Sequence, residues 1–121
     1  MSLAEHLLDL GQVLAQHRGD DLELLSALGI IRLRQGRHEQ ALALFQRARA
    51  NDNSGFSGDK WQTLIDTARY WTQVRRGDSA LTDGHLRRAE QNYRLAVRLQ
   101  PDSPDAWLGL GDVARRRGDT L

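Results

Sequence analysis

The sequence predicts an all-α fold, a solenoid of antiparallel helix pairs, and the spacing of its glycines is the first reason. Six of the 11 glycines form three pairs with the same internal spacing, namely Gly29 with Gly36, Gly77 with Gly84, and Gly111 with Gly118. The last two pairs are separated by about 34 residues, and a fixed period of this length indicates a repeat architecture. The first two pairs lie further apart, as an insertion into the same period would place them. The second reason is composition, because abundant Leu, Ala, Arg and Gln favour helices.

The residues that follow the second glycine of a pair also recur. The same increments occur in two stretches, Gly36, Ala41, Phe45, Ala48 and Gly84, Ala89, Tyr93, Ala96. Together with Trp107, Leu110 and Gly111, this pattern resembles the tetratricopeptide repeat, a helix-turn-helix of about 34 residues. The resemblance implies a tetratricopeptide-type α-solenoid of about two full repeats, with a half repeat at each end and one first helix extended by an insertion. We expect the first glycine of each pair to let a neighbouring helix approach, and the second to end the first helix in the left-handed conformation.

Residues 1–20 are expected to form the second helix of a truncated preceding repeat, with the helix itself over residues 2–18. Ser2 and Glu5 have the spacing of a capping box, which marks a helix start. Counting back one period from the first full repeat places Leu7, Gly11 and Leu14 at second-helix positions.

Residues 21–54 are expected to form the first full repeat, with a first helix capped by Asp20 or Asp21 and a second helix from about Arg37 to Ala50. Residues 55–69 comprise a loop and the N-terminal extension of a long helix, because residues 51–58 are mostly Asn, Asp, Ser and Gly. Asp59 and Gln62 form another capping box, and the helix that they open is expected to run for about 24 residues.

Residues 70–103 are expected to form the second full repeat, whose second helix extends from about His85 to Leu99. Ser103 and Pro104 then provide an N-cap followed by proline at the first helical position. Residues 104–121 form the first helix of a truncated repeat, and the partner helix that its apolar face needs is expected beyond Leu121. The exposed half repeats at the two ends would allow two copies of this segment to dimerise.

Charge and motif content exclude several functional classes. The 17 basic and 16 acidic residues are interleaved and leave a net charge of +1, which argues against nucleic-acid binding. Without cysteine there are no thiolate metal sites or thiol nucleophiles, and the four histidines follow no metal-binding spacing. The sequence has no phosphate-binding glycine loop, no Gly-x-Ser-x-Gly motif and no apolar run long enough to span a bilayer. We therefore expect no enzymatic activity, cofactor, metal ion or membrane insertion.

The resemblance to tetratricopeptide repeats implies that protein partners bind the concave wall lined by the first helices. The inward-facing positions of the three first helices hold Glu23, Ser26, Ile30, Arg34, Trp71, Val74, Asp78, Asp105, Leu108, Asp112 and Arg115. Modules of this family that clamp a C-terminal carboxylate use Lys and Asn at two of these positions. Ser26 and Ile30 occupy them in the first repeat, so a carboxylate clamp is not expected.

Three aromatic residues, Trp61, Tyr70 and Trp71, cluster on the expected long helix. Aromatic residues at helical spacing usually belong to a core. An exposed cluster would instead provide an aromatic platform for direct polysaccharide binding. The sequence leaves both interpretations open.

The segment at residues 60–71, Lys-Trp-Gln-Thr-Leu-Ile-Asp-Thr-Ala-Arg-Tyr-Trp, is not generic repeat sequence. It resembles the extended-helix insertion in the periplasmic tetratricopeptide region of the family of cellulose export proteins that accompany bacterial cellulose synthase. The resemblance implies a non-enzymatic periplasmic scaffold in cellulose or exopolysaccharide secretion, within a full-length protein anchored at the outer membrane. Its partners would be synthase or secretion proteins, with the glucan chain as a further candidate. The alternative is a generic peptide-binding module of another complex, located in the cytoplasm.

Overall fold

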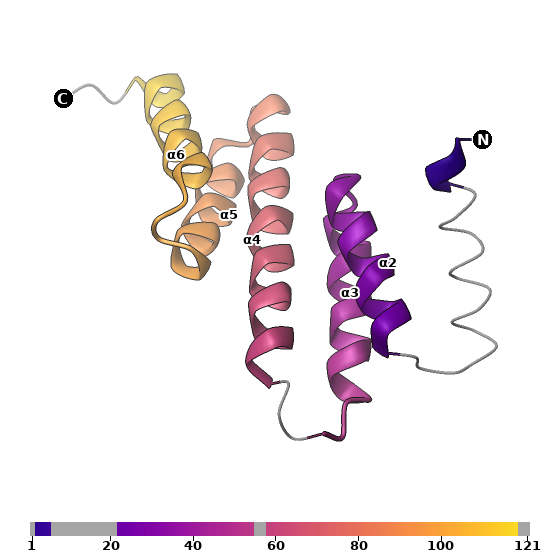
Figure 1. Ribbon diagram of the computed structural model, residues 1–121. Helices are drawn as coiled ribbons and strands as arrows, with labels where there is room; N and C mark the ends of the chain where they lie inside the picture. The colour runs from indigo at the N-terminus through magenta and orange to yellow at the C-terminus, as the bar shows by residue number, and fades with distance from the viewer. Residues whose placement is uncertain (1, 6–21, 55–57, 119–121) are drawn as a thin grey trace. The chain divides into compact units, whose positions relative to one another are not determined.

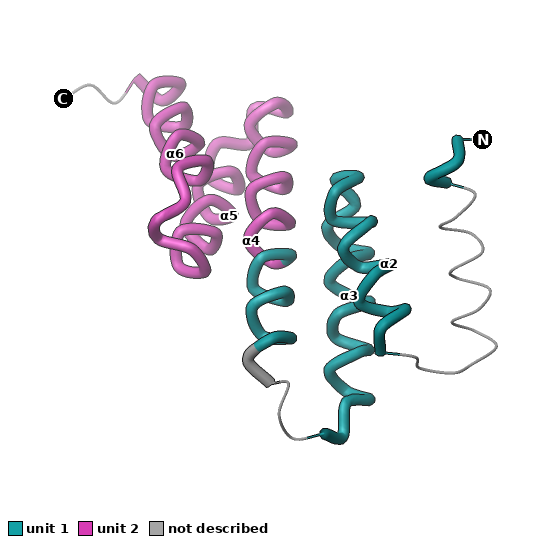
Figure 2. Tube along the Cα trace, viewed as in Figure 1, with its two compact units in different colours: residues 1–68 teal, residues 69–121 magenta. Residues whose placement is uncertain are grey.

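The computed structural model describes residues 2–5, 22–54 and 58–118 (Figure 1). Within these ranges the chain forms helices only: α2 (Leu22–Arg34), α3 (His38–Ala50), α4 (Gly58–Thr82), α5 (Leu86–Leu99) and α6 (Pro104–Arg117), besides a short helical turn at residues 3–5. The all-α prediction is confirmed. The expected long helix is α4, with 25 residues. Contacts divide the chain into unit 1, residues 1–68, and unit 2, residues 69–121 (Figure 2).

The N-terminal capping box is confirmed by its hydrogen bonds. The Glu5 N–H donates to Ser2 Oγ at 3.2 Å, and the Ser2 N–H donates to Glu5 Oε2 at 3.4 Å. The rest of the helix expected over residues 2–18 lies outside the described residues, as do the side chain of Asp59 and the cap residues Asp20 and Asp21.

Unit 1 is held together by a core in which α2, α3 and the N-terminal part of α4 meet. This core consists of Leu25, Leu28, Ala41, Phe45, Ala48, Trp61, Ile65 and Ala68. The loop between α3 and α4 is tied to the core through Asp52. The Trp61 indole N–H donates to Asp52 Oδ2 at 2.7 Å, and the Ser54 N–H donates to Asp52 Oδ1 at 3.0 Å.

Unit 2 contains the remainder of α4 together with α5 and α6. Its two buried clusters are Ala80, Leu81, Ala89, Tyr93, Val113 and Tyr70, Val74, Ala96, Ala106. Near the start of α6 and of the part of α4 that belongs to unit 2, the Ala106 N–H donates to the Tyr70 hydroxyl at 3.3 Å. Near their ends, Arg116 Nη1 donates to the Leu81 carbonyl at 2.7 Å. The two segments are therefore close together both near their starts and near their ends. This part of α4 runs parallel to α6, as the first helices of successive repeats should.

The turns after α2 and α4 have the same structure. The φ angles of Gly36 and Gly84 are 77° and 78°, in the left-handed region that the glycine pairs predict. In each turn the residue after the glycine donates its N–H five residues back, Arg37 to the Arg32 carbonyl at 2.9 Å and His85 to the Ala80 carbonyl at 2.8 Å. These are Schellman motifs, which satisfy carbonyls that the helix end would otherwise leave unpaired.

The predicted close-packing role is confirmed for two of the three first glycines. A Cβ built on Gly29 would lie 2.4 Å from Phe45 Cε1, and one on Gly77 would lie 2.6 Å from Tyr93 Cε1. The prediction for Gly111 is wrong within the described residues, because a Cβ there would meet no atom within 4 Å. In the first two cases the ring comes from the helix that follows, whereas the described part of the chain ends at Gly118. On α6 the close approach falls on Gly109, whose Cβ would lie 2.4 Å from Tyr93 Cε1.

Candidate interaction surface

The eleven residues predicted to line a binding wall fall into three classes of exposure. Six are exposed, namely Glu23, Arg34, Asp78, Asp105, Leu108 and Arg115, and three are partly buried, namely Ile30, Trp71 and Asp112. Ser26 and Val74 are buried, so the prediction that they face a partner is wrong. Val74 packs in the cluster that contains Tyr70, Ala96 and Ala106, and Ser26 lies on the side of α2 that also buries Leu25.

In unit 1, the candidates are the α2 residues that remain accessible. Glu23 is exposed in the first turn and Arg34 in the last turn, which are the ends where a helix dipole favours an acid and a base. Ile30 packs against the unit 1 core. These charges are explained by helix stability alone.

In unit 2, the accessible candidates lie on two parallel helices, and we call them the α4–α6 surface. It consists of Trp71, Asp78, Asp105, Leu108, Asp112 and Arg115. Leu108 is 66% exposed, the most exposed large hydrophobic side chain on α6. Arg115 forms an ion pair with Asp112 on the same helix. A protruding apolar side chain among oriented charges is suited to contact with another protein, where apolar anchors carry binding energy within a polar rim.

Asp78 on this surface is held by the core beneath it. The Tyr93 hydroxyl donates to Asp78 Oδ1 at 2.5 Å. Burial, this hydrogen bond and the Asp78 charge together raise the pKa of Tyr93 well above its ordinary value. The carboxylate is therefore positioned by an aromatic ring that also fills unit 2.

The three-residue aromatic platform is not present on the surface. Trp61 is 2% exposed in the unit 1 core, with its indole N–H bonded to Asp52. Tyr70 is 0% exposed, and its ring meets Trp71 edge-on with centroids 5.0 Å apart. Stacking on a sugar needs an open ring face, which Trp61 and Tyr70 do not offer. The core interpretation of these two rings is therefore correct, and the platform interpretation is wrong.

A groove with a volume of about 470 Å³ lies between α5 and α6, and its α6 side is the apolar face of the last half repeat that the sequence predicted to need a partner helix. Its lining includes Val97, Trp107, Leu110 and Ala114, with charged residues at its edge. Trp107 is 54% exposed, and its indole N–H donates to the Pro101 carbonyl at 2.8 Å.

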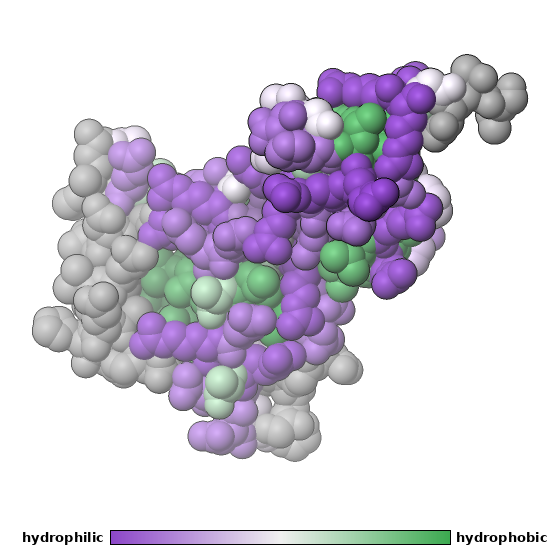
Figure 3. All heavy atoms as spheres, turned by 180° about the vertical axis from the view of Figure 1, so that it is seen from behind, coloured by the Kyte–Doolittle hydropathy of each residue, from purple (hydrophilic) through white to green (hydrophobic). Residues whose placement is uncertain are grey.

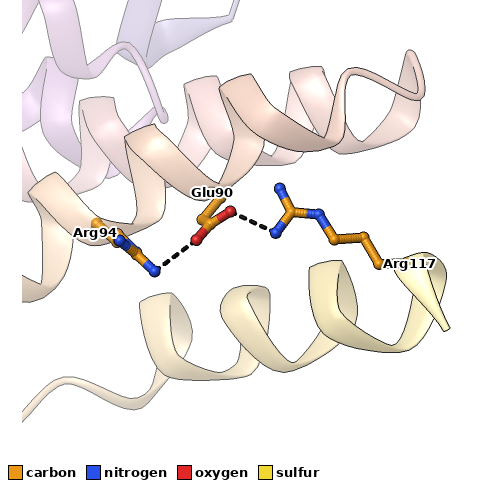
Figure 4. Close-up of polar contacts among 3 residues, drawn as sticks. All are labelled: Glu90, Arg94 and Arg117. Atoms are coloured by element: carbon orange, nitrogen blue, oxygen red, sulfur yellow. Dashed lines mark ion pairs between the residues drawn. The ribbon is translucent and has the colours of Figure 1, made fainter. Parts of the chain in front are cut away.

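The edge of this groove carries an ion-pair network (Figure 4). Glu90 on α5 pairs with Arg94 at 2.6 Å and, across to α6, with Arg117 at 2.6 Å. The hydrogen bond from Arg117 is the main reason that the pKa of Glu90 is lowered; burial opposes it, and the charges of Arg117, Arg94 and Arg87 add to it. The spacing of Glu90 and Arg94 by four residues was a signal for their pair. No sequence signal connects either to Arg117.

A tetratricopeptide repeat family model matches residues 3–56 and 74–120. The chain belongs to the tetratricopeptide repeat family. The match leaves out residues 57–73, which contain the segment at 60–71 and the start of the long helix. The interruption of the repeat match therefore coincides with the insertion into the repeat period.

The chain also shares sequence identity with several curated relatives over most of its length. The chain is 36% identical over 96 residues to cellulose synthase operon protein C of Xanthomonas axonopodis pv. citri, covering 79% of this chain and 6% of that protein. It is 39% identical over 94 residues to the protein of the same name from Salmonella typhimurium, covering 78% and 8%. It is 37% identical over 91 residues to that of Escherichia coli K12, covering 75% and 8%. The chain therefore spans less than a tenth of the length of these relatives.

Tetratricopeptide repeats are non-catalytic modules that mediate protein interactions. Among the described residues no group of three or more His, Asp or Glu side chains is placed to hold a metal ion. None of the helices in the described ranges combines the length and apolarity needed to cross a membrane. On the face shown in Figure 3, hydrophobic residues form separate patches among hydrophilic ones.

Proposed function

We propose that this tetratricopeptide chain is a non-enzymatic scaffold for protein–protein interaction in a bacterial system that synthesises and secretes cellulose or a related exopolysaccharide. The observation that carries the proposal is the 36% to 39% identity to proteins named cellulose synthase operon protein C. This similarity covers over three quarters of the chain in both cases, including part of the region that the repeat family model does not match.

The partners would be protein components of the synthase or of the secretion apparatus, and the site of action would be the periplasm. The α4–α6 surface supports a protein partner, because Leu108 projects from a surface whose other members are mostly charged. Direct capture of glucan by Trp61, Tyr70 and Trp71 is not proposed, because two of the three rings are buried.

The proposal is tested by replacing Leu108 in the bacterium that encodes this chain. Leu108→Glu puts a charge at the exposed apolar residue of the α4–α6 surface, whose side chain is 66% exposed and outside the core clusters. Leu95→Glu is the matched control, because Leu95 is 43% exposed on α5 and belongs neither to this surface nor to the groove. Secreted cellulose is measured as acid-released glucose, with protein levels checked by immunoblot.

We expect Leu108→Glu to reduce secreted cellulose at least fivefold at unchanged protein level, and Leu95→Glu to leave it unchanged. Deletion of the whole gene should abolish secretion. Normal cellulose output in the deletion strain would refute a role in this system. Normal output with Leu108→Glu would refute the α4–α6 surface as the contact.

A further inference from the structure

One side of α5 points away from the core of unit 2. The core side of this helix carries three fully buried residues, Ala89, Tyr93 and Ala96. At 3.6 residues per turn, four exposed residues lie within about 50° of the opposite direction. We call them the α5 outer surface: Arg87, Gln91, Arg94 and Arg98. A further helix of the repeat would pack beside α5, in the groove that it forms with α6, and would leave this outer side open.

The equivalent side of α3 has the opposite charge. The shift that relates Phe45 to Tyr93 also relates the α5 outer surface to four residues of α3, namely Glu39, Ala43, Gln46 and Ala50. Three arginines and no acid on α5 thus correspond to one acid and no base on α3. Both helices bury two alanines and an aromatic residue at the same spacing. The packing of the helix pair therefore does not require the arginines.

The chain leaves most of this positive charge unpaired. Glu90 is the one carboxylate on α5, and its two oxygens pair with Arg94 and with Arg117 (Figure 4). Arg87 and Arg98 form no ion pair with any residue that the structure describes. Their guanidinium groups are accessible to anions from outside the chain.

The surface is hollowed at one end and extended along the helix. Arg87 and Gln91 line a hollow of about 430 Å³, together with His85, Leu86 and Arg88. From Arg87 to Arg98 the row of arginines covers about 16 Å along the helix axis. Several separate anions, spaced along one line, would therefore meet the arginines better than a single compact ligand.

The shape of the surface favours a flat occupant. It is the outer side of a single helix, so its projecting side chains can reach a plane without a complementary groove. A bilayer with anionic lipids presents a plane of phosphate groups, which the planar guanidinium of arginine binds through paired hydrogen bonds. Each basic residue near such a membrane strengthens binding by roughly fivefold. An acidic protein would need a matching concavity to contact all three arginines.

We infer that the α5 outer surface lies on an anionic lipid bilayer, with Arg87, Arg94 and Arg98 in contact with lipid phosphates. The contact is made at the membrane surface and inserts no helix. It uses no residue of the α4–α6 surface, so it is independent of the proposed function.

The test is co-sedimentation of the 121-residue chain with vesicles of phosphatidylcholine, with and without phosphatidylglycerol as a third of the lipid. Arg87→Gln combined with Arg98→Gln removes the two unpaired charges and keeps both ion pairs of Glu90. The matched control combines Arg34→Gln with Arg37→Gln, which removes the same charge from exposed residues of unit 1. Circular dichroism verifies that each variant is folded.

We expect the chain to bind the vesicles that contain phosphatidylglycerol at least tenfold more tightly than the neutral vesicles at low salt. The α5 double variant should lose at least tenfold of this affinity, and the control should stay within threefold of the wild type. Binding to neither kind of vesicle, equal binding to both, or equal losses in the two double variants would overturn the inference. Tighter binding of polyglutamate than of the vesicles, at equal concentrations of negative charge, would assign the surface to an acidic polymer and would also overturn it.

A second measurement locates the contact without removing any arginine. The chain has no cysteine, so an environment-sensitive dye can be attached at one chosen position. Gln91→Cys places the dye on the α5 outer surface, and Ala43→Cys places it at the equivalent exposed position of α3. Anionic vesicles should shift the emission of the dye at position 91 and leave that at position 43 unchanged. Equal responses at the two positions, or a larger response at position 43, would contradict the inferred contact.

Discussion

The Tyr93 hydroxyl donates a 2.5 Å hydrogen bond to Asp78, whereas the equivalent residues of the first repeat are Phe45 and Ile30. The hydroxyl and its acceptor are thus present together in one repeat and absent together in the other. Both rings pack against the equivalent glycine of their repeat, Tyr93 against Gly77 and Phe45 against Gly29. The Tyr93–Asp78 hydrogen bond is thus added to an apolar packing that both repeats share. Its contribution to stability can therefore be measured separately from that of the ring.

Tyr93→Phe should lower the free energy of unfolding by about 1.5 kcal/mol, because it removes a hydrogen bond to a charged acceptor and keeps the ring. Adding Asp78→Ile recreates the pair of the first repeat and should recover part of that loss. Urea denaturation followed by circular dichroism measures both. Equal stability of the wild type and Tyr93→Phe would show that the bond contributes nothing.

High pH should destabilise the protein through the same residue. The pKa of Tyr93 is raised above its ordinary value of 10.0, so the folded state holds this proton more tightly than the unfolded state. The contribution is therefore complete below about pH 10 and is lost progressively as the pH rises beyond it. Tyr93→Phe should flatten the fall in stability between pH 9 and 11. An unchanged fall would assign the effect to other groups.

Gly109 and Gly111 form a matched pair, two residues apart on α6. Gly109→Ala should destabilise unit 2 by about 1 to 3 kcal/mol, because the new methyl group overlaps the Tyr93 ring. Gly111→Ala should stabilise it by about 0.5 to 1 kcal/mol, because a helical alanine replaces glycine in open space. Thermal unfolding of both variants provides the comparison. A loss of stability with Gly111→Ala would contradict the open space beside Gly111.

Acid should weaken the contact between α5 and α6. The pKa of Glu90 is lowered in the folded state from its ordinary value of 4.5, so its stabilising effect is present above that value and is lost as the pH falls through the folded value. Glu90→Gln should remove this dependence, and 1 M NaCl should reduce the difference from wild type. Unfolding midpoints measured from pH 3 to 7 test the sign. If the difference in unfolding midpoint between the wild type and Glu90→Gln stays constant from pH 7 to pH 3, the predicted acid dependence is refuted.

The different environments of Trp61 and Trp107 should give the two residues different degrees of fluorescence quenching by a solute. Trp61 is in a core and Trp107 is half exposed. In variants that keep only one of the three tryptophans, iodide should quench Trp107 several-fold more strongly than Trp61. Comparable quenching of the two would restore the possibility of an accessible platform at Trp61.

Local features of this fold were predictable because they depend on spacing. The turns at Gly36 and Gly84, the start of α6 at Pro104 and the length of α4 all follow from residues close together in the chain. Each is determined by a backbone preference or by helical periodicity, which the sequence shows directly.

The candidate surfaces were less predictable because they depend on which neighbours are present. Ser26 and Val74 occupy expected binding positions but are buried by tertiary packing. Trp107 matches the repeat pattern but is exposed, and Arg117 reaches Glu90 from another helix. Periodicity assigns a residue to a face of a helix, whereas contacts between helices decide whether that face is covered.

The central claim is that this chain works by contacting a protein through the α4–α6 surface, and site-specific photo-crosslinking tests it most directly. A photoreactive amino acid is introduced in place of Leu108, and separately in place of Leu95, in the bacterium that encodes the chain. We predict a light-dependent adduct from position 108 that mass spectrometry assigns to a cellulose synthesis or secretion protein, with no such adduct from position 95. Absence of a protein adduct at position 108, or the same adducts from both positions, would contradict the claim.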